Sequence, residues 1–201
     1  MKKLLLLLGI PALLFGIFVL MGVSTYNGLV NRAQAVDGAW AQVENVYQLR
    51  ADLVPNLVNT VSGAADFEKS TLTEVTRARA SIGSVQLPAG AAPNATQLAE
   101  FERAQTQLGS SLSRLLVSVE RYPQLTATAG FRDLQAQLEG TENRIAVERS
   151  KFNTIVQNYN AAIKRFPAVM VAGLFGHESR VYFKADRGAE VAPVVDFGPK
   201  P

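Results

Sequence analysis

The chain has 201 residues, of which 20 are basic and 17 acidic, so its formal net charge is +3 at neutral pH. The charges are scattered, whereas a phosphate-binding surface needs clustered Lys and Arg, so nucleic acid is not expected as a partner. The chain has no cysteine, which excludes disulfides, zinc–cysteine sites and thiol nucleophiles.

Residues Leu4 to Val23 form a run of twenty residues without a charge, preceded by Lys2 and Lys3. As a helix, such a run is about 30 Å long, which is the thickness of a bilayer's hydrocarbon core. A cleavable signal peptide is the rival interpretation, with Gly22-Val23-Ser24 as its cleavage site, but the apolar region of signal peptides spans only about 7 to 15 residues. We therefore expect an uncleaved signal anchor, a transmembrane helix over residues 1–24.

The flanking charges and the small residues of this run refine the expectation. Basic residues precede the span while only Arg32 follows closely, which favours a cytoplasmic N-terminus and a body on the far side of the membrane. Pro11 near the cytoplasmic end is tolerated in lipid as a local kink. Ala12 and Gly16 form one small-xxx-small pair, which would let two spans approach closely.

The body, residues 25–185, begins with a coiled-coil-like seam in which apolar residues alternate steps of four and three. Arg50 occupies the one gap in this pattern. The register continues across Pro55, so we expect a single long helix with a kink near Ala51 and Asp52. The seam consists of Leu29, Ala33, Val36, Trp40, Val43, Tyr47, Val54, Leu57 and Val61.

Three more helices are predicted after a weak point at Gly63, with Asp66 as the cap of the first of them. The predicted ranges are 66–85, 96–122, closed by Pro123, and 130–166, with a loop over the small residues and prolines of 87–94. Each helix carries an apolar face that cannot remain in water. The fold class is therefore all-α, an antiparallel bundle of about four long helices behind the membrane helix.

The sequence changes character after Pro167. Residues 169–175 are apolar and predict a short helix or turn packed on the end of the bundle. A β-prone triplet, Val181-Tyr182-Phe183, follows. Residues 186–201 contain three prolines and few apolar residues, and we interpret them as an extended, irregular C-terminal tail.

Several motifs together resemble the LemA family, and the resemblance covers nearly the whole chain. In chain order they are Tyr26-Asn27-x-Leu29-Val30, Ala39-Trp40 with Val43-Glu44, 50–58 (Arg-Ala-Asp-Leu-Val-Pro-Asn-Leu-Val), Glu120-Arg121-Tyr122-Pro123, 138–145 (with Glu142-Asn143), Phe152-Asn153, Tyr159-Asn160 and Phe166-Pro167. The resemblance implies a bacterial envelope protein with an N-terminal membrane helix and a helical bundle. It implies no enzymatic activity and no cofactor. The expected location is the bacterial inner membrane, crossed once, with the bundle on the extracytoplasmic side.

Arg50, Asp52 and Asn56 form the most interesting polar cluster, because Pro55 frees a backbone carbonyl that needs a partner. They are expected to form a buried network that satisfies the kink and fixes the register of the bundle. A kink that docks a partner is the functional alternative. Trp40 is similarly interpreted as a core anchor in the seam, with a ligand platform as the alternative.

The two Tyr-Asn pairs, Tyr26-Asn27 and Tyr159-Asn160, would lie at the membrane-proximal end if the first and last long helices are antiparallel. His177 beside Glu178 lacks the two or three spaced ligands that a metal needs. Carboxylates at Glu139, Glu142 and Glu148 suit surface charges or salt bridges better than acid–base catalysis. No catalytic or metal residue is therefore assigned.

Three functional hypotheses follow from different classes. The leading one is a non-enzymatic, membrane-anchored scaffold or adaptor, whose helical faces bind other envelope proteins or further copies of the chain. The second is a self-assembling protein that shapes the bilayer or senses membrane stress. An uncharacterised enzyme is the third. The expected partners are the lipid bilayer, envelope membrane proteins and, as a homo-oligomer, the chain itself.

Overall fold

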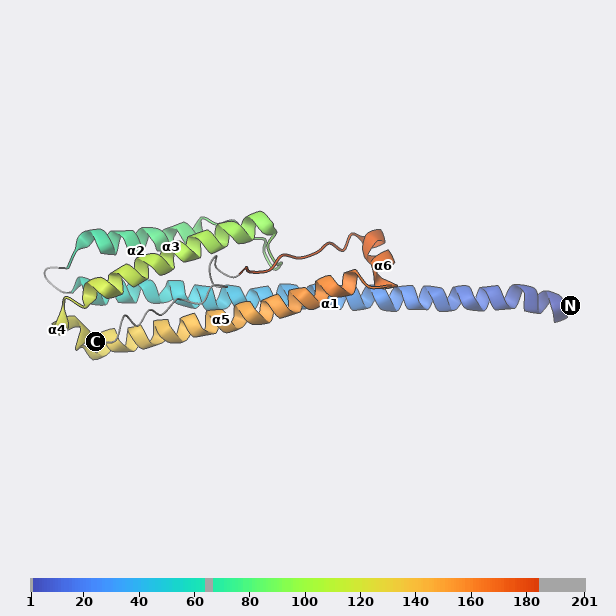
Figure 1. Ribbon diagram of the computed structural model, residues 1–201, viewed down its shortest axis with the longest axis horizontal. Coiled ribbons are helices and arrows are strands. Elements are labelled where there is room, and N and C mark those ends of the chain that lie inside the picture. The colour runs from blue at the N-terminus through green and yellow to red at the C-terminus, as the bar shows by residue number, and fades with distance from the viewer. Residues whose placement is uncertain (1, 64–66, 185–201) are drawn as a thin grey trace, which may run out of the picture.

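A computed structural model describes residues 2–63 and 67–184, with side chains from Gly9 onward (Figure 1). These residues are helical or irregular and include no strand, so the all-α prediction is confirmed for the described part of the chain. The helices are α1 (Lys2–Ser62), α2 (Lys69–Gly83), α3 (Ala95–Val119), α4 (Pro123–Thr126), α5 (Ala129–Ile163) and α6 (Ala168–Phe175).

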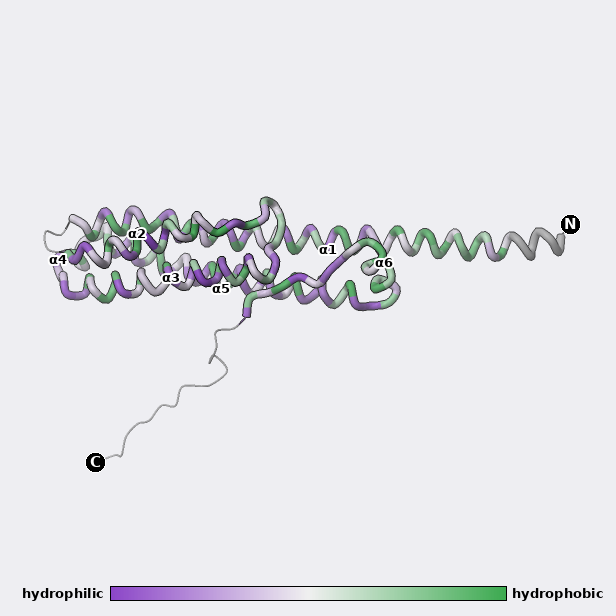
Figure 2. The backbone as a smooth tube through the Cα atoms, turned by 90° about the horizontal axis from the view of Figure 1, so that it is seen from above, coloured by the Kyte–Doolittle hydropathy of each residue, from purple (hydrophilic) through white to green (hydrophobic). Residues whose placement is uncertain are grey.

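The first helix runs without interruption from the apolar run to the far end of the bundle. Its 61 residues correspond to a length of about 92 Å. By length and composition α1 can cross a membrane, and the side chains from Gly9 to Leu20 are all exposed. In Figure 1 this part of α1 projects beyond the other helices, and in Figure 2 it is predominantly hydrophobic. A single apolar N-terminal helix of this kind suits membrane anchoring.

The four long helices alternate in direction, as the antiparallel bundle predicts. In Figure 1, α1 and α5 run side by side in opposite directions, and α2 and α3 form a second antiparallel pair on top of them. The seam of α1 is buried as expected: Val36, Val43, Leu57 and Val61 are fully buried and Trp40 is 1% exposed.

Two hydrophobic cores share the bundle. The core nearer the apolar run gathers around Trp40, Phe101 and Phe152. The distal core gathers around Leu57, Leu108 and Leu115. Arg50 lies between the two along α1, so the gap in the heptad pattern corresponds to a polar layer that separates them.

Helix ends differ from the predicted ones by a few residues, for local reasons. The third helix starts at Ala95 because Asn94 and Gln97 form a reciprocal capping box. It ends at Val119 instead of Tyr122, and Pro123 begins the short α4 instead of only closing α3. Proline is favoured at a first helical position, where no N–H is needed.

The other boundaries shift in the same way. Thr128 caps α5, which ends at Ile163 instead of Phe166. The second helix starts at Lys69 with Glu68 at its N-cap, whereas the predicted cap, Asp66, lies outside the described residues. The loop predicted over 87–94 is confirmed.

The C-terminal part of the described chain returns along the bundle. The predicted short helix is α6, packed against α1 at the end nearest the apolar run (Figure 1). Gly176 ends α6 in the left-handed conformation with φ +70°, where a side chain would be strained. The segment 177–184, which we call the strap, is extended but forms no β-strand, and it pairs with no strand in the described chain. The predicted tail, 186–201, lies outside the described residues.

Candidate functional site

Pro55 does remove a hydrogen bond from α1, but its consequence differs from the expected kink. Pro55 lies inside α1, and in Figure 1 this helix runs along the bundle without a sharp bend. The carbonyl of Ala51, four residues before Pro55, has lost its helical donor. Instead, Nε of Arg79 on α2 donates a hydrogen bond of 2.9 Å to that carbonyl. The proline thus creates an attachment point for α2.

The expected buried cluster of Arg50, Asp52 and Asn56 is wrong for two of its members. Asp52 and Asn56 are exposed, as is Pro55. Asp52 accepts a hydrogen bond of 2.9 Å from Gln48, which lies one turn before it on the same exposed face of α1. Residues two apart on a helix point to different sides, so Asp52 cannot share the buried position of Arg50.

Arg50 itself is the centre of the polar layer and is 4% exposed. Its Nη1 donates to Glu142 of α5 at 2.7 Å, and its Nη2 donates to both the backbone carbonyl, at 3.1 Å, and the side-chain oxygen of Gln105 on α3. The guanidinium also lies 5.1 Å from the ring centroid of Tyr47. One side chain of α1 therefore connects to both α3 and α5.

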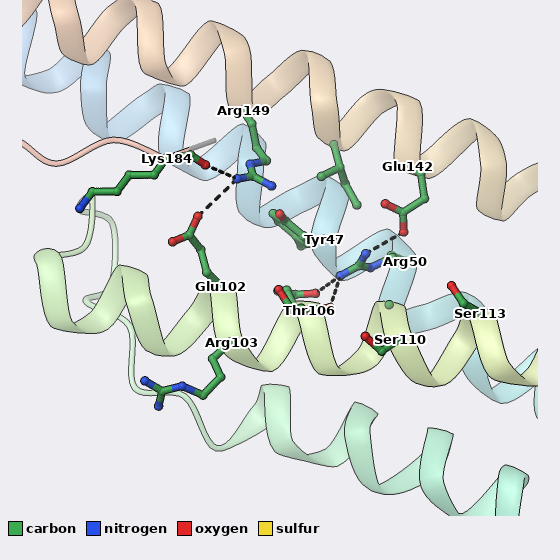
Figure 3. A pocket seen from close by; sticks show the side chains of 13 residues that line it. Tyr47, Arg50, Glu102, Arg103, Thr106, Ser110, Ser113, Glu142, Arg149 and Lys184 are labelled. Atoms are coloured by element: carbon green, nitrogen blue, oxygen red, sulfur yellow. Dashed lines mark hydrogen bonds and ion pairs between the residues drawn. The ribbon is translucent and has the colours of Figure 1, made fainter. Parts of the chain in front are cut away.

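A groove of about 590 Å³ opens between α3 and α5 over this layer. Figure 3 shows Arg50 and Arg149 reaching into it from α1 and α5. Arg149 forms an ion pair of 3.3 Å with Glu102 of α3, which spans the groove near its end. The charged groups that line it are four cations, Arg50, Arg103, Arg149 and Lys184, and two anions, Glu102 and Glu142. Hydroxyl groups of Thr106, Ser110 and Ser113 complete the wall on α3.

Burial shifts the ionisation of groups beside this layer. The low-polarity surroundings raise the pKa of the Tyr47 hydroxyl, and the nearby guanidinium groups of Arg149 and Arg50 oppose that rise. Burial also raises the pKa of the Glu44 carboxyl, while the Trp40 side chain acts in the opposite direction. Tyr47 is therefore a neutral wall of the groove at physiological pH.

Trp40 occupies the centre of an aromatic cluster, which agrees with its interpretation as a core anchor. Its ring centroid lies 5.3 Å from that of Phe101, 5.6 Å from that of Phe152 and 6.0 Å from that of Phe183. These rings come from α1, α3, α5 and the strap. The cluster therefore joins four segments at one level of the bundle.

Two asparagines of α5 hold the strap, a role that the sequence analysis missed. Asn153 accepts from the backbone N–H of Phe183 at 2.9 Å and donates to its carbonyl at 3.0 Å. Asn160 does the same with Arg180, at 2.8 Å and 2.7 Å. The signal was present in the repeated aromatic–Asn pairs seven residues apart. In each pair the aromatic residue is buried in the core and the asparagine binds the strap.

The two Tyr-Asn pairs do lie at the same end of the bundle. The rings of Tyr26 and Phe175 are 4.7 Å apart, and those of Tyr26 and His177 are 6.0 Å apart. The Tyr159 hydroxyl lies 3.4 Å from Nδ1 of His177, and burial raises the pKa of that hydroxyl. Asn27 is exposed and Asn160 binds the strap, so the two asparagines differ in role.

The remaining candidates lie on surfaces. Pro11, Ala12, Gly16 and Val23 are exposed along α1, as membrane-facing residues would be, while the side chain of Leu4 lies outside the described ones. Asn143 is exposed, and Glu142, half exposed, reaches the Arg50 layer. Among the described residues, no three His, Asp or Glu side chains gather in a way that could hold a metal ion.

Comparison with known proteins settles the family. A family model described as the LemA family matches residues 39–197. The chain belongs to the LemA family. The matched region starts beside Trp40, within α1, and includes the Arg50 layer and the strap, so the groove is built from residues inside the family domain.

Three relatives of this LemA family member are each less than 30% identical to it. It is 24% identical to the magnetosome protein MamQ of Magnetospirillum gryphiswaldense over 209 aligned positions, which cover 94% of this chain and 75% of MamQ. Over 87 residues it is 29% identical to magnetosome protein MamQ 2 of Paramagnetospirillum magneticum, covering 43% and 32% of the two chains. It is 21% identical to protein LemA of Metamycoplasma hominis over 154 residues, covering 77% and 66%.

Proposed function

We propose that this LemA family member is a non-enzymatic, membrane-anchored scaffold of the bacterial envelope. In this proposal α1 crosses the inner membrane once with its N-terminus in the cytoplasm, and the bundle on the extracytoplasmic side binds envelope proteins or further copies of the chain. The observation that carries the proposal is the continuity of α1 from Lys2 to Ser62. An anchor that continues as a bundle helix sets the height of the whole domain and its orientation relative to the span.

The continuous helix places each surface of the bundle at a defined height. Arg50 lies 27 residues beyond Val23, which corresponds to about 40 Å along a straight helix. The groove between α3 and α5 opens at this level. Its four cations outnumber its two anions, so it favours an acidic segment of a partner. A fixed height suits a protein that has to meet partners of fixed geometry, whereas a flexible tether would suffice for an enzyme with a soluble substrate.

The test is to change the height without changing the bundle. Inserting seven helix-forming residues between Val23 and Ser24 would raise the bundle by about 10.5 Å and rotate it by only about 20°. Insertion of seven Gly and Ser residues at the same place is the matched control, because it keeps both parts and removes their rigid connection. The readout is proximity labelling by the full-length chain in its native envelope.

A scaffold predicts a specific set of labelled neighbours that both insertions reduce. Labelling that does not differ from that of a bare anchor, residues 1–24 carrying the same label, would contradict the proposal. If both insertion variants label the same neighbours as the natural chain, the bundle is tethered to the membrane but its height does not matter, and that part of the proposal is rejected.

A second candidate function is supported by the apolar surface of α6, which lies beside the part of α1 that emerges from the apolar run. A shallow apolar helix next to a span can wedge lipid headgroups apart, so a self-assembling, membrane-shaping protein is the alternative. Purified full-length protein on liposomes tests it. Liposomes that neither deform nor cluster at high coverage would exclude this alternative.

A further inference from the structure

The helix α6 exposes an apolar surface that the rest of the bundle does not match. Its eight residues, Ala-Val-Met-Val-Ala-Gly-Leu-Phe, contain no polar side chain, and only Ala172 is buried. Beyond Val23, the large hydrophobic residues exposed elsewhere in the described chain are scattered singly at Leu49, Val117, Val147 and Tyr182. In and just before α6 five such residues lie within ten positions: Phe166 (80% exposed), Val169 (46%), Met170 (60%), Leu174 (78%) and Phe175 (57%). Clustered exposure of this kind marks a binding surface.

The position of α6 indicates what covers this surface. Phe175 packs on Tyr26 with ring centroids 4.7 Å apart. Tyr26 follows Val23, the last residue of the apolar run, by three residues, or about 4.5 Å along the helix. A tyrosine at this point matches the aromatic belt of membrane proteins. The apolar surface of α6 is therefore level with the boundary between the span and water.

The orientation of α6 suits the same boundary. In Figure 1 α6 lies across the axis of α1, and in Figure 2, a view turned by 90°, it is seen nearly end-on. If α1 runs along the bilayer normal, α6 lies in the plane of the membrane. This is the arrangement of interfacial helices, whose apolar face is buried in the boundary between headgroups and acyl chains.

The charges around α6 favour a lipid surface over the apolar face of another protein. Lys164 and Arg165 directly precede the apolar stretch, and both are exposed. The first acidic residue after them is Glu178, beyond the helix. Basic residues beside an apolar interfacial helix attract phosphate groups of anionic lipids.

We infer that α6 is a second membrane contact, an interfacial helix that inserts into the headgroup region beside the point where α1 leaves the bilayer. This inference rests on the proposed anchoring of α1. A rigid α1 fixes the bundle relative to the span, but a single span can still tilt as a whole in the bilayer. A second contact beside it limits that tilt. Through the strap, which Asn153 and Asn160 hold, it also connects the membrane surface to the middle of the bundle.

The absence of cysteine from the chain makes a direct test possible. The full-length protein carries one introduced cysteine labelled with an environment-sensitive nitrobenzoxadiazole, in vesicles of phosphatidylcholine and phosphatidylglycerol. The positions are Leu174→Cys and Met170→Cys on α6, Phe15→Cys within the span and Val117→Cys, 65% exposed on α3, as the matched control. Doxyl-labelled lipids report depth, and aqueous iodide reports exposure to water.

The inference predicts that both α6 labels are quenched by doxyl groups near the headgroups and shielded from iodide, at a depth of about 5–10 Å. Phe15→Cys should be quenched by doxyl groups deep in the acyl chains, and Val117→Cys by iodide alone. Iodide quenching of both α6 positions with deep quenching at Phe15 would overturn the inference and leave the anchor intact. Protection of α6 from both quenchers would also overturn it, because a protein would then cover the surface.

The remaining outcomes separate the inference from the anchor. If lipid quenches neither Phe15→Cys nor the two α6 labels, both the anchoring of α1 and the contact made by α6 are rejected. Lipid quenching at α6 without quenching at Phe15 would reject the span and retain the contact made by α6.

Discussion

Replacing Arg50 by methionine removes the centre of the polar layer while filling most of its volume. The side-chain oxygen of Gln105 then loses its donor inside a bundle where Gln105 is only 4% exposed, and an unsatisfied buried acceptor costs about 1–3 kcal/mol. The ion pair with Glu142 adds little, because that carboxylate is 50% exposed and exposed pairs contribute about 0–1 kcal/mol. We expect Arg50→Met to lower the free energy of unfolding by about 1–3 kcal/mol.

The assay is denaturant unfolding of the full-length protein, followed by fluorescence of Trp40, the sole tryptophan, which is 1% exposed in the adjacent core. Two further variants assign the loss. Glu142→Gln should cost less than about 1 kcal/mol. Adding Gln105→Leu to Arg50→Met should recover most of the loss, since replacing both partners of a buried polar contact by apolar groups is often neutral. An Arg50→Met variant as stable as the natural chain, or a Glu142→Gln variant as unstable as Arg50→Met, would refute this reasoning.

Three other predictions concern single residues. Arg79→Met should lower the free energy of unfolding by about 1 kcal/mol in the natural chain, measured by the same denaturant unfolding. It should lower it by almost nothing in a Pro55→Ala background, because the Ala51 carbonyl regains its helical donor there. Equal losses in both backgrounds would contradict the assignment of the Arg79 hydrogen bond. Asn153→Ala should accelerate amide hydrogen exchange at Phe183 and leave Arg180, held by Asn160, protected, whereas loss of protection at both would show that the strap is one cooperative unit. Because burial raises the folded-state pKa of Glu44, its protonated form is favoured in the bundle, so its contribution to stability is present below its ordinary pKa and is lost as pH rises through the raised value. Glu44→Gln should therefore flatten the pH dependence of the unfolding midpoint in that window, and a profile unchanged from that of the natural chain would refute it.

The heptad pattern was sufficient to predict α1, because one face of that helix is buried along its whole length within the bundle. The same pattern located Arg50 as a buried break in the seam, because Arg50 keeps the spacing of the seam and differs from the apolar residues there only in its charge. The grouping with Asp52 and Asn56 failed because it relied on nearness in sequence, although residues two apart on a helix point to different sides. The partner of the carbonyl freed by Pro55 was out of reach, because Arg79 is brought to it only by the packing of α2.

The strap shows another limit of prediction from periodic sequence patterns. An extended segment that docks through its backbone leaves no period in its own sequence, so 177–184 gave only a β-prone triplet. Its attachment is encoded on α5 instead, where Asn153 and Asn160 follow buried aromatic residues at a heptad spacing. The predicted short helix after Pro167 was confirmed as α6, but its position beside Tyr26 depends on how α5 and α1 pack, which hydropathy alone does not describe.

The central claim is that the span and the bundle share one rigid helix. Pulsed electron paramagnetic resonance between spin labels at Phe18→Cys and Asn45→Cys, in the full-length protein in lipid bilayers, tests it directly, because both side chains are exposed and lie on opposite sides of the junction. Their separation of 27 residues predicts one narrow distance distribution centred at about 40 Å. A broad distribution, or a centre well below that distance, would show a hinge between the membrane helix and the bundle and would contradict the account.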